Sequence, residues 1–243
     1  GLLSSLYRAN LENYELSWMG VVGERLGDTG GVKRYSMLTS RFFTTDDEKV
    51  DTIVYSLPVE WWSRIYEYPW AGRFAKQGHV VLDAGCGIGH HFKFALAGVC
   101  KQVHACDIDP NIINEPFIIE TIKKGFNFDV TELCGNIYYK ICDLGNLDYP
   151  DHSFDRVFCI SVLEHCHTSK YLSILKEFKR VLKEDGLIIL TFDVPTHNLL
   201  GLLPQLMGET GLTFAGGFNS QKPENAIYGV GLNVFRAVLK HEL

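Results

Sequence analysis

The sequence has no long apolar run, no cluster of basic residues and no internal repeat. The first absence excludes a membrane-spanning helix from this sequence. The second, together with a formal net charge of −6, argues against broad electrostatic binding of nucleic acid or of an anionic membrane. Residues 1–5 lack the charged and apolar regions of a signal peptide. We therefore expect a cytoplasmic protein that does not insert into membranes.

Paired cysteines are also missing. Seven cysteines are present and none forms a C-x-x-C pair, so reduced thiols are the simplest interpretation. The run Glu164-His165-Cys166-His167 contains metal-binding residue types. Consecutive residues rarely converge on one ion without ligands from elsewhere in the chain, so we expect no metal site.

Two regions of different character make up the 243 residues. Residues 1–75 are rich in aromatic and charged side chains and are expected to form an N-terminal helical and aromatic cap on the substrate side. Residues 76–243 alternate between strand and helix patterns. This alternation is typical of an α/β fold with a doubly wound, mostly parallel sheet.

The pattern of apolar residues and turn residues predicts a seven-stranded sheet. Gly125 is expected to end one helix and Asp185-Gly186 another. The predicted helices span 89–97, 110–125 and 169–183, and the predicted strands span 79–84, 102–107, 137–142, 154–161, 187–192, 212–214 and 232–239.

The most informative stretch, residues 80–89, reads VVLDAGCGIG. A β-branched, apolar run enters Asp83, and glycines follow at alternate positions. Such a strand ends in a tight turn, where the missing side chains let backbone amides approach a ligand. The spacing is G-x-G-x-G, and His90 stands where a dinucleotide-binding fingerprint has its third glycine.

Three aspartates fall at the ends of predicted strands: Asp83, Asp107 and Asp143. Ligands of an open parallel sheet bind at the carboxyl ends of its strands. Asp107, 24 residues after Asp83, is placed to accept both hydroxyls of a ribose, and Asp143 can accept the amine of an adenine. Each residue also has a structural interpretation, because Asp107 and Asp109 can cap a helix and Asp143 can begin a turn. Their order along the chain favours a nucleoside-type cofactor.

In these motifs the chain resembles class I S-adenosylmethionine-dependent methyltransferases, of the type 11 or ubiquinone/menaquinone-biosynthesis-like group. The resemblance covers about residues 78–192. It rests on the segments VLDAGCGIG at 81–89, HACDID at 104–109, CDL at 142–144, DHSFDRV at 151–157, SVLEH at 161–165 and FKRVLKEDGL at 178–187.

The resemblance implies S-adenosylmethionine as cofactor and S-adenosylhomocysteine as its product. Asp83 and the glycines would line the methionine part, Asp107 the ribose, and Asp143 the adenine amine. Ile160 and Ser161 would lie near the sulfonium. The full cofactor-binding set implied is Asp83, Ala84, Gly85, Cys86, Gly87, Asp107, Ile108, Cys142, Asp143, Leu144, Ile160 and Ser161.

The acceptor side is less marked in the sequence. His165 follows the fourth strand and is the candidate general base, since its pKa suits neutral pH; the alternative is that Glu164 and His165 orient the cofactor loop. Candidate acceptor residues are Tyr35, Tyr66, Tyr68 and Trp70. The segment 64–70 resembles uncharacterised methyltransferases associated with polysaccharide gene clusters. These aromatics can equally pack a helical layer onto the sheet.

Three functions remain at this point. The first is O- or N-methylation of a small-molecule or saccharide acceptor. The second is an NAD-dependent oxidoreductase, against which the G-x-G-x-G spacing counts. The third is a protein that binds the cofactor without catalysis. The sequence indicates no oligomeric state.

Overall fold

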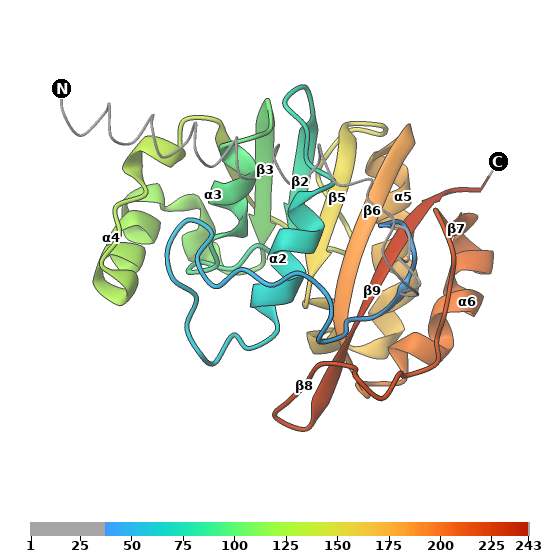
Figure 1. Ribbon diagram of the computed structural model, residues 1–243. Helices are drawn as coiled ribbons and strands as arrows, with labels where there is room; N and C mark the ends of the chain where they lie inside the picture. Colours follow the sequence, from blue (N-terminus) through green and yellow to red (C-terminus); the bar gives the residue numbers. More distant parts are fainter. Residues whose placement is uncertain (1–36, 243) are drawn as a thin grey trace. The chain divides into compact units, whose positions relative to one another are not determined.

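The computed structural model describes residues 37–242, so Tyr35 lies outside the described residues. These residues form one mixed sheet with strand order β1-β9-β6-β5-β2-β3-β4, and β7 and β8 also pair with β9 (Figure 1). The strands are β1 Arg41–Phe42, β2 Val80–Ala84, β3 Gln102–Asp107, β4 Ile137–Ile141, β5 Phe154–Ile160, β6 Leu182–Val194, β7 Leu212–Phe214, β8 Tyr228–Gly229 and β9 Leu232–His241.

The sheet confirms the predicted fold class. Strands β2 to β6 pair in parallel, and β9 runs antiparallel to β6. All seven predicted strands are present; β1 and β8, each of two residues, were not predicted. The α-helices are α2 Arg64–Gly72, α3 Phe92–Ala97, α4 Glu115–Phe126, α5 Tyr171–Val181 and α6 Leu199–Thr210. The 3-10 helices are η1 Pro110–Ile113, η2 Thr131–Leu133, η3 Leu163–His165 and η4 Thr168–Lys170.

Several predicted helix boundaries were wrong. The helix predicted over 110–125 is broken at Asn114, whose side chain accepts from the amide of Phe117 and so begins α4 anew. α4 ends at Phe126 and not at Gly125, and Asn127 follows it in the left-handed conformation, with φ of 51°. Asp185-Gly186 does not end α5: α5 stops at Val181, and both residues lie in the irregular first part of β6.

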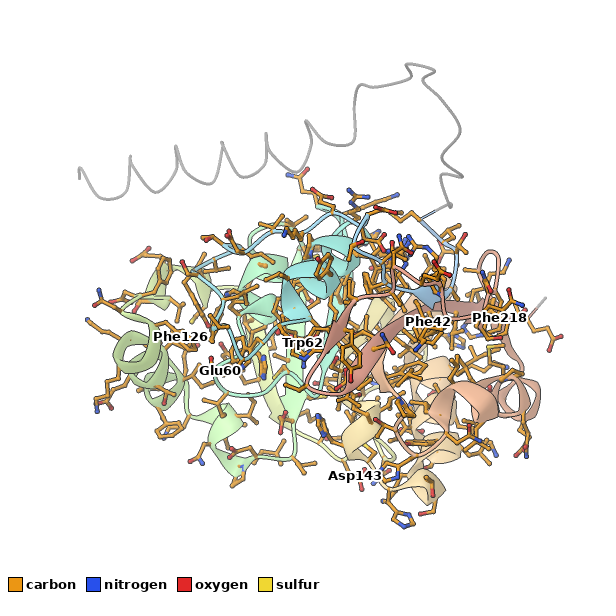
Figure 2. The ribbon with its side chains drawn as sticks, turned by 60° about the horizontal axis from the view of Figure 1, so that its bottom comes forward. Phe42, Glu60, Trp62, Phe126, Asp143 and Phe218 are labelled. Atoms are coloured by element: carbon orange, nitrogen blue, oxygen red, sulfur yellow. The ribbon has the colours of Figure 1, made fainter. Side chains whose placement is uncertain are left out.

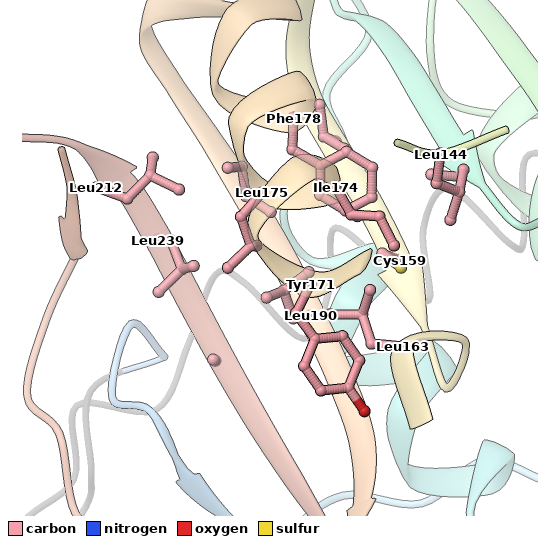
Figure 3. Packing of buried hydrophobic residues seen from close by; sticks show 14 of the residues in the cluster. Leu144, Cys159, Leu163, Tyr171, Ile174, Leu175, Phe178, Leu190, Leu212 and Leu239 are labelled. Atoms are coloured by element: carbon pink, nitrogen blue, oxygen red, sulfur yellow. The ribbon is translucent and has the colours of Figure 1, made fainter. Parts of the chain in front are cut away.

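The main hydrophobic core lies between α5 and the sheet. Figure 3 shows Tyr171, Leu175 and Phe178 along α5, and these residues belong to one buried cluster with Leu190 of β6. All four side chains are buried. The spacing of three and four residues along α5 places its apolar side chains on one face of the helix, which is why this segment packs as a helix.

Residues 37–75 contribute to the same sheet. β1 pairs with β9, with Phe42 opposite Phe235, and the two rings meet edge to face with centroids 5.2 Å apart. α2 contacts β5 and α3. The division of the chain at about residue 75 stays a prediction, and we keep the term cap for the described residues 37–75.

Within residues 37–242, no helix has the length and apolar character needed to cross a bilayer. All seven cysteines are free thiols.

Phe178→Ala should lower the free energy of unfolding by about 3–5 kcal/mol, because it removes a fully buried ring and leaves a cavity between α5 and the sheet. Urea denaturation measures the change. Lys176→Ala, on the exposed face of the same helix, is the control and should change stability by less than about 0.5 kcal/mol. A loss below about 1 kcal/mol for Phe178→Ala would contradict this packing.

Candidate functional site

The carboxyl ends of the parallel strands meet at one edge of the sheet, which Figure 2 turns forward. Asp83 lies near the end of β2, Asp107 is the last residue of β3, and Ser161 directly follows β5. β2 pairs with both β3 and β5. The structure therefore places these three polar residues at the ends of adjacent strands.

The loop after β2 makes its turn at two glycines. Gly85 has φ of 75° and Gly87 has φ of 58°, conformations that residues with a side chain rarely adopt. A Cβ atom at Gly85 would lie 2.6 Å from a methyl of Val162, and one at Gly87 would lie 2.7 Å from the His90 ring. Glycine is therefore required at both positions for conformation and for space.

Backbone amides of this loop are held by β3. The amides of Gly85 and Cys86 donate to the carbonyl of Cys106, at 2.9 and 3.0 Å. The Gly87 amide donates to Oδ2 of Asp107 at 2.9 Å. The loop and the end of β3 are thus tied together at the position where the sequence predicts a cofactor.

Lys93, on α3, holds the carbonyls of the same loop. Its fully buried Nζ donates to the carbonyls of Gly87 at 2.8 Å, Ile88 at 3.1 Å and His90. Burial lowers the pKa of Lys93, and the nearby acidic groups oppose this shift. These bonds also explain why α3 begins at Phe92 and not at Gly89: the carbonyls before it bind a lysine instead of helical amides.

Asp83 carries an unpaired acceptor. Its Oδ2 is buried and has no hydrogen-bond partner within residues 37–242. Burial raises the pKa of Asp83 to about 7; Lys93 lowers it and Asp107 raises it further. A buried acceptor without a donor is costly. A ligand that presents an ammonium group would supply the donor, which fits the methionine part of the expected cofactor.

Asp107 uses both carboxylate oxygens within the protein. Oδ2 accepts from the Gly87 amide, and Oδ1 accepts from the Asp109 amide at 3.0 Å. Each oxygen keeps a lone pair that can accept a ribose hydroxyl. Asp109 caps η1 through the amide of Asn111, so the capping interpretation holds for Asp109. Ile108 is 74% exposed beside the site, an apolar surface available to an adenine ring.

Asp143 lies in the turn after β4. Oδ1 accepts from the Gly145 amide at 2.8 Å, and Oδ2 pairs with Lys170 at 3.0 Å. The pKa of Asp143 is below its ordinary value, first because of the Gly145 amide and then because of Lys170. The turn interpretation therefore holds, while the exposed carboxylate keeps lone pairs for an amine. The neighbouring Cys142 and Leu144 are buried.

Ser161 joins the sheet edge to the cap. It has φ of 49°, its amide donates to the Thr191 carbonyl at 2.9 Å, and its Oγ donates to Oε1 of Glu67 at 2.6 Å. Glu67 is fully buried on α2 and also pairs with Arg64. Burial acts to raise the pKa of Glu67, but Arg64 and then Ser161 outweigh it, so the net shift is downward.

A small cavity of about 40 Å³ lies at this edge. Its lining includes Asp83, Ser161 and Arg64, together with Val162 and His90, which cover the two glycines. A nucleoside with a methionine arm is larger than this cavity. Side chains that line the cavity therefore have to move when such a ligand binds, and Val162 and His90 are candidates because they lie against the glycines.

Aromatic side chains of the cap lie over the glycine loop. Trp61 stacks on His90 with centroids 4.1 Å apart, Tyr68 shares a hydrogen bond of 3.0 Å with Nδ1 of His90, and the Tyr55 hydroxyl donates to the Gly89 carbonyl at 2.8 Å. Burial lowers the pKa of His90 to about 3, so this imidazole is neutral. The cap thus contacts the loop expected to hold the cofactor.

The three candidate acceptor residues within the described chain take different positions. Tyr68 lines the cavity, and Tyr66 is half-buried on α2. Trp70 is buried in the core, edge to face with Phe43 at 5.5 Å. For Trp70 the structure agrees with the packing interpretation of these aromatics.

The turn after Ser161 places two neighbouring residues differently. His165 is exposed at the end of η3, and no hydrogen bond or ion pair within residues 37–242 holds its side chain. Glu164 is only 4% exposed and accepts from the Asp193 amide at 3.3 Å through Oε1. Burial raises the pKa of Glu164 to about 8.

Sequence reasoning missed Lys93 and Glu67 as parts of the site. A signal for Lys93 was present, since a lysine interrupts the apolar segment FKFALA directly after the glycine loop. Glu67 lies in the segment noted before the first strand, but its contact with Ser161 spans 94 residues and has no local signature. In the described part of the chain, no group of three or more metal-ligating side chains was found.

Comparison with known proteins agrees with this geometry. Residues 82–190 match the family model of a methyltransferase domain. The chain is 34% identical over 128 residues to a ubiquinone/menaquinone biosynthesis C-methyltransferase of Cellvibrio japonicus, covering 51% of this chain and 47% of the relative. It is 27% identical over 147 residues to a tRNA U34 carboxymethyltransferase of a Sulfurovum strain, covering 60% of this chain and 45% of the relative.

The chain thus spans less than half the length of these two relatives. Among solved structures, it is similar to a TehB-like S-adenosylmethionine-dependent methyltransferase from Corynebacterium glutamicum. The TM-score is 0.50 at 19% identity, over 72% of this chain and 87% of that structure. At this identity the likeness supports the fold.

Lys93→Met should weaken binding of S-adenosylmethionine on the order of tenfold, or about 1.4 kcal/mol. The substitution keeps the length of the side chain and removes the donor shared by three loop carbonyls. Titration calorimetry measures the affinity. Lys101→Met, exposed just before β3, is the control and should bind like the wild type. Unchanged affinity in folded Lys93→Met would show that the lysine does not organise the loop.

Proposed function

We propose that the protein is a class I S-adenosylmethionine-dependent methyltransferase, because residues 82–190 match the family model of a methyltransferase domain. Its acceptor in this proposal is a small molecule or a saccharide, methylated at oxygen or nitrogen. The net charge of −6 favours a small acceptor over a nucleic acid, although one relative is named for tRNA. A cytoplasmic location remains the prediction of the sequence.

The observation that carries the proposal is the pair formed by Asp83 and Asp107 on either side of the glycine loop. Asp83 offers a buried, unpaired Oδ2. Asp107 fixes the loop amide and keeps lone pairs for hydroxyl groups. An ammonium group and a ribose, as in S-adenosylmethionine, match these two sets of acceptors. The proposed cofactor set keeps the residues named from the sequence.

When bound, the cofactor supplies an electrophilic methyl group on a sulfonium. The protein has to hold the acceptor in line with the S–C bond and to exclude water. Ser161, fixed by Glu67 and by the Thr191 carbonyl, would form the wall next to the reacting atoms. Tyr68 would close the site from the cap, and Tyr66 is a further candidate for acceptor contact.

The oxidoreductase alternative receives no support beyond a shared fold type. The G-x-G-x-G spacing of the loop departs from the dinucleotide-binding fingerprint. The third candidate, binding of the cofactor without catalysis, is tested by methyl transfer itself. A screen over sugars, phenols, amines and thiols with mass-spectrometric detection would identify an acceptor, and transfer to none of them would favour the third candidate.

Asp107→Ala should weaken binding of S-adenosylmethionine by about 1.5–3 kcal/mol, because it removes charge-assisted bonds to the ribose and frees the Gly87 amide. Titration calorimetry with S-adenosylmethionine and with NAD measures both affinities. Asp185→Ala, exposed in β6, is the control. Tight binding of NAD by the wild type, without binding of S-adenosylmethionine, would overturn the proposed function.

Affinity for S-adenosylhomocysteine should rise with pH between about 5 and 7 and level off above about 7. The pKa of Asp83 is raised to about 7 by burial, so the carboxyl is protonated at low pH and becomes an acceptor for the ligand ammonium when it ionises. Binding should therefore release a proton below that pKa.

Calorimetry over this pH range, in two buffers of different ionisation enthalpy, measures the effect. Asp83→Asn should bind more weakly and with a flatter pH profile. A wild-type affinity independent of pH would contradict the role given to Asp83. Lys93 and Asp107, the charged groups that act on Asp83, are present in both the wild type and Asp83→Asn.

A further inference from the structure

A second group of carboxyls lies next to the cofactor site. Glu67 comes from α2, Glu164 from η3 and Asp193 from β6, and Arg64 is the cation among them. Glu164 and Asp193 each respond electrostatically to Glu67, and all three acids respond to Arg64. Three elements distant in the sequence therefore bring an excess of acidic groups to one place.

One of these carboxyls is fully satisfied. Glu67 accepts from Ser161 through Oε1, and from Ser63 Oγ at 2.9 Å and Arg64 through Oε2. Arg64 is mostly buried beside it, and the two form an ion pair. Arg64 forms its ion pair with Glu67, and within residues 37–242 neither Glu164 nor Asp193 forms an ion pair. Arg64 acts on both of them only electrostatically, as does His165 on Asp193.

The other two carboxyls each have an unpaired oxygen. Glu164 uses Oε1 for the Asp193 amide, while its buried Oε2 has no partner within residues 37–242. Oδ1 of Asp193 is buried and likewise unpaired in this part of the chain. The pKa of Asp193 is raised, first by burial and then by Glu67. Buried acceptors of this kind are rare in native proteins unless a ligand or water supplies the donor.

The position of the cluster relates it to methyl transfer. Arg64 and Ser161, which contact Glu67, line the same cavity as Asp83 and Gly85. Glu164 follows Ser161 by three residues in the same turn. Tyr68 adds an aromatic ring to the cavity, a surface that attracts cations. Unpaired carboxylate oxygens recognise a group that carries several N–H donors and a positive charge.

We propose that the methyl acceptor is an amine, bound through its N–H groups by Oε2 of Glu164 and Oδ1 of Asp193, with Glu164 as the proton acceptor. This rests on the proposed function. The bound ammonium gives one proton to the Glu164 carboxylate. The freed nitrogen lone pair forms the N–C bond to the methyl carbon, and the S–C bond breaks with its electron pair retained on sulfur as a thioether. The product is a methylated ammonium.

The test uses pairs of compounds that differ by an amine or a hydroxyl in the same place: benzylamine and benzyl alcohol, glucosamine and glucose, ethanolamine and ethylene glycol. Calorimetry with the full chain saturated with S-adenosylhomocysteine measures the affinity of each. At least one amine should bind at least tenfold more tightly than its hydroxyl partner. With S-adenosylmethionine, the same amine should yield an N-methyl product by mass spectrometry.

The variants are Glu164→Gln and Asp193→Asn, which keep the shape of each side chain. Glu164→Gln should weaken amine binding at least tenfold and abolish methyl transfer. The affinity of Glu164→Gln for S-adenosylhomocysteine and its melting temperature show whether this variant is folded. Asp193→Asn is the second variant and should also weaken amine binding. Glu132→Gln, an exposed residue of η2, should behave as the wild type. His165→Asn tests the other candidate base, which was predicted from the sequence. This variant should still bind the amine.

Three results would overturn the proposal: hydroxyl partners that bind as tightly as the amines, no binding by any amine, or wild-type amine affinity in Glu164→Gln. Failure of the proposed function looks different, because then S-adenosylhomocysteine itself does not bind to the wild type.

Discussion

The site depends on one constraint: the loop after β2 turns at a partly buried sheet edge, where its backbone groups find hydrogen-bond partners inside the protein. An unpaired backbone group is costly where it is buried. The Cys106 carbonyl and the Asp107 carboxylate accept hydrogen bonds from the loop amides. Lys93 and the Tyr55 hydroxyl donate hydrogen bonds to the loop carbonyls. These partners keep the loop in one conformation, so the strand ends next to it are held at fixed positions.

The cap contributes to this arrangement at two points. Its aromatic rings pack on the residues that end the loop, His90 above all, and Glu67 binds Ser161 at the end of β5. A change at the cap is therefore transmitted to the cofactor loop and to the wall expected near the methyl group. His90 and Val162 lie against the glycines, so the cap contacts a side chain next to the expected cofactor. We infer that the cap responds to the cofactor as well as to the acceptor.

The fold and the placement of polar residues at the strand ends were predictable from the sequence because their signals are local; the cofactor contacts assigned to these residues stay predictions. The run VVLDAGCGIG specifies a strand, a turn and two positions for glycine within ten residues. Strand ends then place Asp107 and Ser161 beside it without further information. Helix boundaries failed where side chains compete for backbone groups: Asn114 interrupts a helix by capping the next one, and Lys93 binds carbonyls that a helix would use. The acceptor side has no such local signal. The contact of Glu67 with Ser161 spans 94 residues, and Trp70 was indistinguishable by sequence from an aromatic that faces a ligand.

The central claim is that this sheet edge binds an adenosine with a methionine arm, and a crystal structure of the protein with S-adenosylhomocysteine tests it most directly. Our account predicts the ribose hydroxyls on Asp107, the adenine between Ile108 and Leu144, and the amino group on Asp83, with the His90 and Val162 side chains turned away from the glycines. Density for the ligand elsewhere on the protein, with His90 and Val162 still covering Gly87 and Gly85, would contradict the account.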